Sequence, residues 1–128
     1  MTRVMILLLL AALPLSAQTN SPATPEGYKM ISEITKADGS YLGTLIGKPV
    51  GAYLYSTILI VRLRGATLDT LFRFYNDHTN PRYQGCGVHV LSHDSIGVWY
   101  ESPVSASDEE DFYWDDSLKT YKVVDYGY

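Results

Sequence analysis

The chain has 128 residues, with 10 basic and 14 acidic side chains, a formal charge of -4 and a single cysteine. This length is enough for one domain and not for two, and the acidic balance argues against nucleic acid as a partner. One cysteine cannot form an internal disulfide, so the fold must depend on its apolar core.

The N-terminal segment has the layout of a secretory signal peptide. Arg3 precedes an apolar run from Val4 to Leu13, and the small residues Ser16 and Ala17 follow. The run is about ten residues long, whereas a helix that crosses a bilayer needs roughly twenty. We therefore predict cleavage after Ala17, export to the periplasm or the extracellular space, and no stable membrane anchor after cleavage.

The predicted mature chain is a short leader followed by one domain. Once the signal peptide, residues 1–17, is removed, residues 18–27 are rich in proline and small polar residues and form a flexible leader. Residues 28–128 form a single globular domain. Its first strand is predicted over residues 28–35, and the turn residues Asp38-Gly39 predict a hairpin into the next strand.

A long apolar run follows over residues 53–64, "YLYSTILIVRLR". Tyrosine, threonine, isoleucine and valine favour an extended strand over a helix. Both faces of this strand would be largely apolar. A strand with two apolar faces belongs in the middle of a sheet.

One helix is predicted, near residues 67–78. Its apolar stripe consists of Leu68, Leu71, Phe72 and Tyr75. These residues recur at intervals of three, four and seven, as on one face of a helix, and Thr67 could cap its first turn. A strand over "LFRFY", residues 71–75, remains the alternative, because Phe74 lies off the stripe.

The rest of the chain has the pattern of two hairpins, one around His93-Asp94 and one around "DDSLK", residues 115–119. The predicted fold class is therefore α+β: a mostly antiparallel sheet of about six or seven strands packed with one helix.

The stretch "QGCGVHVLSHDS" raises the question of a metal site or a thiol enzyme, because it contains Cys86, His89 and His93, with His78 upstream. In a strand, Cys86 and His89 point to opposite faces and cannot bind one ion together. His89 and His93 remain candidate metal ligands. Cys86, His78 and His89 remain candidates for a catalytic thiol and its histidine.

An alternative role for Cys86 is a disulfide with a second chain, which would give a Cys86-linked dimer. The chain contains no phosphate loop, no G-x-S-x-G elbow and no H-E-x-x-H motif. We therefore predict no cofactor.

The negative charge is concentrated in the last quarter of the chain. Residues 101–128 carry eight acids and two lysines, whereas residues 18–100 carry six acids and seven bases. Aromatic side chains alternate with the acids and could supply contact area for a basic partner. The alternative is a solvated loop with inward-facing aromatic residues. The predicted partner-binding residues are Asp108, Glu109, Glu110, Asp111, Phe112, Trp114, Asp115 and Asp116.

Three functions follow from these patterns. The first is a small exported binding module, such as a proteinaceous inhibitor or a protective protein, that engages a basic protein through the acidic C-terminal hairpin. The second is a thiol- or metal-dependent enzyme that uses Cys86 with His78, His89 or His93. The third is a structural or interaction protein linked through Cys86.

Overall fold

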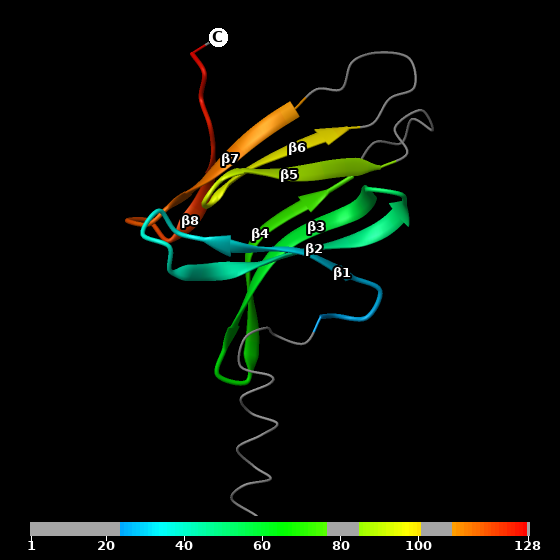
Figure 1. Cartoon of the computed structure of the whole chain (residues 1–128), viewed down its shortest axis with the longest axis horizontal. Coiled ribbons are helices and arrows are strands. Elements are labelled where there is room, and N and C mark those ends of the chain that lie inside the picture. The colour runs from blue at the N-terminus through cyan, green and yellow to red at the C-terminus, as the bar shows by residue number, and fades with distance from the viewer. Residues whose placement is uncertain (1–23, 77–84, 101–108, 128) are drawn as a thin grey trace, which may run out of the picture.

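The computed structural model describes residues 24–76, 85–100 and 109–127, which form eight strands (Figure 1). The strands are β1 (Lys29–Thr35), β2 (Tyr41–Gly51), β3 (Leu54–Arg64), β4 (Thr67–Tyr75), β5 (Cys86–Ser92), β6 (Ser95–Tyr100), β7 (Glu109–Asp115) and β8 (Thr120–Val123). Every strand pairing is antiparallel. The described residues include no helix, and hence none long and apolar enough to cross a membrane.

The predicted helix near residues 67–78 is wrong, because Thr67–Tyr75 is strand β4 and pairs with β3 along its length. The pairing slips by one residue at Leu71: Ile60 lies opposite Phe72, and Val61 lies opposite Thr70. In a regular strand, the side chains on one face recur at every second residue. The extra residue of the bulge shifts this alternation, so the apolar residues of β4 fall at intervals of three and four, as they would on one face of a helix. The α+β class is corrected to all-β, and the alternative strand over residues 71–75 is the one observed.

The three predicted hairpins are confirmed. β1 and β2 are joined at Asp38-Gly39, where the Asp38 carboxylate accepts a hydrogen bond from the Ser40 amide at 2.9 Å and Gly39 has a φ of 87°. β5 and β6 are joined at His93-Asp94, and β7 and β8 at residues 116–119. Short polar turns therefore set the order of most strands.

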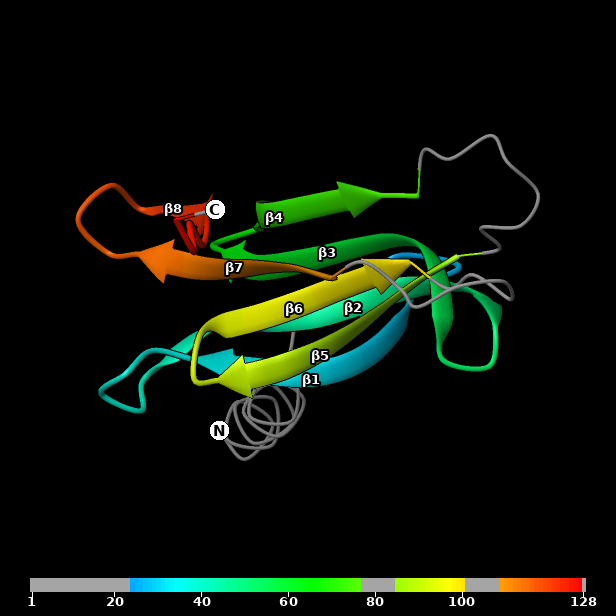
Figure 2. The same ribbon diagram turned by 90° about the horizontal axis from the view of Figure 1, so that it is seen from above.

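Strand β3 is the centre of the fold, as its two apolar faces predicted. It pairs with β2 on one edge and with β4 on the other, and it meets β5 where Tyr55 lies opposite Cys86. The sheet divides at this point into two layers, a first layer of β1 to β4 and a second layer of β5 to β8 (Figure 2). Contacts between β4 and β8 close one side, where the Phe72 and Tyr121 rings lie 5.4 Å apart.

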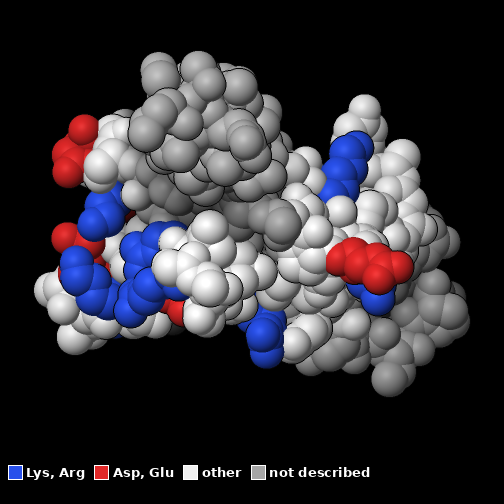
Figure 3. All heavy atoms as spheres, turned by 90° about the horizontal axis from the view of Figure 1, so that it is seen from below, with Lys and Arg blue, Asp and Glu red and all other residues white. Residues whose placement is uncertain are grey.

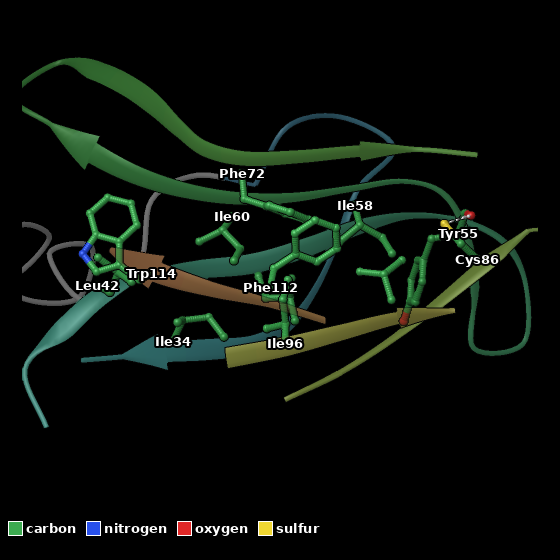
Figure 4. Packing of buried hydrophobic residues seen from close by; sticks show 12 residues of the cluster. Ile34, Leu42, Tyr55, Ile58, Ile60, Phe72, Cys86, Ile96, Phe112 and Trp114 are labelled. Carbon is green, nitrogen blue, oxygen red and sulfur yellow. Dashed lines mark hydrogen bonds between the residues drawn. The ribbon is translucent and has the colours of Figure 1, made fainter. Parts of the chain in front are cut away.

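The main core lies between the two layers. Its buried residues are Ile34, Leu42, Leu45, Tyr55, Ile58, Ile60, Phe72, Cys86, Ile96, Val98, Phe112 and Trp114. Figure 4 shows Trp114 and Leu42 at one end and Tyr55 beside Cys86 at the other, with Phe112 facing Phe72 between them. A smaller cluster on the other face of the first layer contains Ile46, Leu59 and Val61, so β3 buries apolar side chains on both of its faces.

Candidate functional site

The outer face of the second layer brings together side chains from three strands. In the strand register, His89 of β5 lies opposite Gly97 of β6, and Gly97 lies opposite Asp111 of β7. In the next row, Trp99 lies opposite both Gly87 and Glu109. Residues that lie directly opposite one another share a face of the sheet, and this face is the one turned away from the main core.

A glycine in the middle strand lets the His89 side chain reach across to β7. A Cβ atom at Gly97 would lie 2.5 Å from His89 Nε2 and 2.9 Å from Asp111 Oδ1. With that space free, His89 Nε2 lies 2.8 Å from Glu109 Oε1, and the two side chains keep 50% and 34% of their exposure. His89 therefore connects β5 to β7 over the backbone of β6.

Asp111 is held from the other side by the C-terminal segment. The Tyr126 hydroxyl donates a hydrogen bond to Asp111 Oδ2. Asp111 Oδ1 is buried and accepts no hydrogen bond from the described residues. The Tyr126 hydrogen bond, with a further contribution from the Glu109 carboxyl, holds the pKa of Asp111 below its ordinary value. Asp111 is thus the member of this pair that retains its negative charge.

Glu109 is shifted in the opposite direction. Burial, followed by the interaction with the Asp111 carboxyl, raises the pKa of Glu109, although the nearby His89 acts against this rise. Two carboxyl groups in contact cannot both ionise without a cost unless a positive charge lies beside them. Glu109 therefore holds its proton to a higher pH than an isolated glutamate does.

The ring of Trp99 lies against the backbone of Gly87. A Cβ atom at Gly87 would lie only 2.0 to 2.4 Å from three atoms of the indole. Gly87 is buried and Trp99 is half-buried, so the indole covers the glycine and leaves part of its surface to solvent. We call the group of His89, Trp99, Glu109, Asp111 and Tyr126 the acidic face.

The predicted partner-binding residues are divided between surface and core. Glu109, Glu110 and Asp111 lie on β7, and Glu110 is exposed. The side chains of Phe112 and Trp114 are 8% and 6% exposed and belong to the main core. They are therefore not available to a partner on the folded domain. Asp108 lies outside the described residues.

Asp115 and Asp116 organise the β7–β8 turn. Asp115 Oδ1 accepts hydrogen bonds from the Ser117 hydroxyl and from the amides of Ser117 and Leu118. The Ser117 hydroxyl, followed by the Leu118 amide, lowers the pKa of Asp115 to about 2. Asp116 Oδ1 accepts from Trp114 Nε1 and lies 3.0 Å from the ammonium groups of both Lys36 and Lys119. Both carboxylates therefore have hydrogen-bond or ion-pair partners from their own chain.

The thiol of Cys86 is enclosed. Its side chain has no exposed surface, and Sγ donates a hydrogen bond to the Tyr55 carbonyl at 3.1 Å. Burial raises the pKa of Cys86 to about 11, which disfavours the thiolate that catalysis or disulfide formation would need. His89 lies on the opposite face of β5, as the alternation of side chains predicted. His78 lies outside the described residues.

The residues that sequence reasoning left out of the site are Trp99, Tyr126 and the two glycines. A signal for them was present: "GVH" in β5 and "GVW" in β6 each place a glycine two residues before a large side chain, and the antiparallel register sets each large side chain over the other strand's glycine. His93 lies in the β5–β6 turn with a φ of 43°. Among residues 24–76, 85–100 and 109–127, no group of three or more His, Cys, Asp or Glu could hold a metal ion.

Comparisons with known proteins return no match to a family model, to a curated protein or to a solved structure.

We expect the Cys86 thiol to resist alkylation in the native protein. At pH 8, a thiol with a pKa of about 11 is roughly 0.1% ionised, and the core also blocks access to the sulfur. The measurement is the rate of iodoacetamide labelling, followed by mass spectrometry with and without urea. Rapid labelling of the folded protein would contradict the enclosed position of Cys86.

Replacing Gly97 by alanine should break the contact between His89 and Glu109. The new methyl group must push the imidazole away, and crowding of this kind costs about 1 to 3 kcal/mol of unfolding free energy. The readout is the NMR chemical shifts of the His89 ring at one fixed pH, together with urea unfolding. Gly51→Ala is the matched control, because its Cβ would meet only Leu54 at 3.9 Å. His89 ring shifts that are the same in Gly97→Ala as in the wild type would refute the bridging geometry.

Proposed function

We propose that this protein is a small exported binding module that engages a basic protein partner through the acidic face. The single observation that carries the proposal is that the two carboxylates on the outer face of β7, Glu109 and Asp111, have no lysine or arginine partner in the described part of the chain. Glu109 pairs with a histidine, and Asp111 forms no ion pair with any basic residue that the structure describes. Glu110 points to the other face of β7, since it lies opposite Val98 of the main core. A lysine or arginine of another protein would complete this group.

The other carboxylates near the second layer support this proposal by contrast. Asp115 lies 3.3 Å from Lys122, and Asp116 is shared by Lys36 and Lys119. Among the described residues, the lysines therefore neutralise the turn and leave Glu109 and Asp111 at the start of β7 without a lysine or arginine. Figure 3 shows the opposite side of the molecule. There, among the described residues that can be seen, Lys and Arg lie between the Asp and Glu side chains, so these acids form no continuous acidic patch.

Aromatic side chains beside the carboxylates support the proposal that a partner is bound at this face and not only attracted to it by charge. The half-buried indole of Trp99 and the exposed ring of Tyr126 flank Glu109 and Asp111. Tryptophan and tyrosine supply large contact areas with little loss of side-chain entropy, and both attract cations over their rings. A lysine or arginine could therefore find a carboxylate and an aromatic ring within one site.

The proposal predicts that binding depends on charge at Glu109 and Asp111. A double variant, Glu109→Gln with Asp111→Asn, should weaken the retention of basic proteins by at least about tenfold, since each charge-assisted contact contributes about 1.5 to 3 kcal/mol. The measurement is affinity capture with the mature domain at low and moderate salt. Glu26→Gln with Glu33→Gln removes the same charge elsewhere and should leave retention unchanged.

Retention should also fall as the pH is lowered through the raised pKa of Glu109. A basic partner favours the ionised carboxylate, so the proton that Glu109 holds at low pH competes with binding. If both double variants lose retention equally, only the net charge of the domain matters and the proposal is overturned. Retention that does not change as the pH passes through the raised pKa of Glu109 would also overturn it.

A further inference from the structure

Strand β5 has an open edge next to the acidic face. β5 meets β3 only at the pair formed by Tyr55 and Cys86, and every other registered residue of β5 pairs with β6 alone. From Gly87 to Ser92, the backbone groups on the far side of β5 therefore have no strand beside them in the described part of the chain. Val90 and Leu91 on this segment are 40% and 45% exposed.

The other edge strands carry features that oppose strand pairing, and β5 has few of them. β1 has two register shifts and includes Lys29 and Glu33. β4 includes Asp69 and Arg73, and β8 has only four residues, among them Lys122. Proteins commonly protect sheet edges in these ways. β5 has seven residues, no lysine, arginine, aspartate, glutamate or proline, and one irregularity near its end.

We propose that β5 receives an extended, lysine- or arginine-bearing segment of the partner protein as an added strand. Backbone hydrogen bonds would form along Gly87–Ser92, and alternate side chains of the added strand would lie on the same side as the acidic face. This inference rests on the proposed function, because it states how the basic partner reaches that face.

Charge complementarity selects a basic segment as the occupant. Glu109 belongs to β7, but its carboxylate lies 2.8 Å from His89 Nε2 of β5, so negative charge extends toward the open edge. Neighbouring strands lie about 4.8 Å apart, which places the side chains of an added strand beside His89. A lysine or arginine there can extend over β5 toward Glu109, whereas an acidic side chain at the same position would be repelled.

A strand of six residues gives a small interface, well below the about 1,200 Å² of total buried area at which stable complexes begin. The complex should therefore be transient, with specificity supplied by the combination of strand pairing and charge. A second copy of this chain is the less suitable occupant, because its β5 would bring no positive side chain other than histidine to the carboxylates.

Synthetic peptides test the strand addition directly. The probe is an eight-residue peptide of alternating lysine and valine, together with two versions that are N-methylated at alternate amides. The two versions remove opposite sets of backbone donors and keep the same charge. Strand addition predicts that one version loses affinity for the full-length mature domain at least about tenfold while the other retains it, because only one set of donors faces β5.

Amide hydrogen exchange locates the contact. Binding of the unmethylated peptide should slow exchange within Gly87–Ser92 and leave β1 and β8 unchanged. Leu91→Lys should weaken peptide binding more than Val123→Lys does, because both side chains are exposed on edge strands but only Leu91 lies on β5. Equal effects of these two variants would overturn the inference.

The remaining outcomes separate this inference from the proposed function. If both methylated peptides bind equally, while Glu109→Gln with Asp111→Asn still abolishes binding, the acidic face is the site and strand addition is wrong. Strand addition is equally wrong if basic proteins are captured but the peptide does not bind. Protection of Gly87–Ser92 without peptide, accompanied by dimerisation, would assign the edge to a second copy and overturn the inference.

Discussion

The fold depends on β3, which pairs with strands of both layers of the sheet. Most of its length pairs with β2 and β4, and its first residues meet β5 through Tyr55 and Cys86. This short contact forms the strand-paired link between the layers, and it lies at the end of the main core where the thiol and the tyrosine are packed together (Figure 4). Packing at the junction is thus sufficient to explain why the cysteine is buried.

The acidic face is a consequence of that arrangement. Because the second layer covers the main core with one face only, its other face is free to carry polar side chains. Gly87 and Gly97 then determine what can gather there, since each lies beneath a large side chain of the facing strand. A methyl group at either position would move Trp99 or His89. Two residues without side chains therefore position the histidine, the indole and the carboxylates.

Local patterns in the sequence were sufficient for most of the strands and their hairpins. The turn residues predicted the three hairpins correctly, and the two apolar faces of β3 predicted its place in the middle of the sheet. β4 was mistaken for a helix because the bulge at Leu71 disturbs the alternation, and a bulge is a property of the pairing with β3 that the strand alone does not reveal. The inward position of Phe112 and Trp114, by contrast, follows from alternation along β7.

The candidate site was harder to predict, because it depends on register across three strands. The sequence separates His89 from Glu109 by twenty residues, and only the pairings of β5 with β6 and of β6 with β7 bring them together. The acidic segment drew attention to β7. It could not show that Asp115 and Asp116 form ion pairs with lysines, whereas Glu109 and Asp111 have no lysine or arginine partner among the residues that the structure describes.

The most direct test of the central claim is an NMR titration of the isotopically labelled domain, residues 18–128, with poly-lysine. If the acidic face is the binding surface, the largest amide shifts should lie in residues 87–91, 97–99 and 109–111, and they should disappear in Glu109→Gln with Asp111→Asn. Shifts centred on the β7–β8 turn, or small shifts spread evenly over every acidic residue, would contradict it.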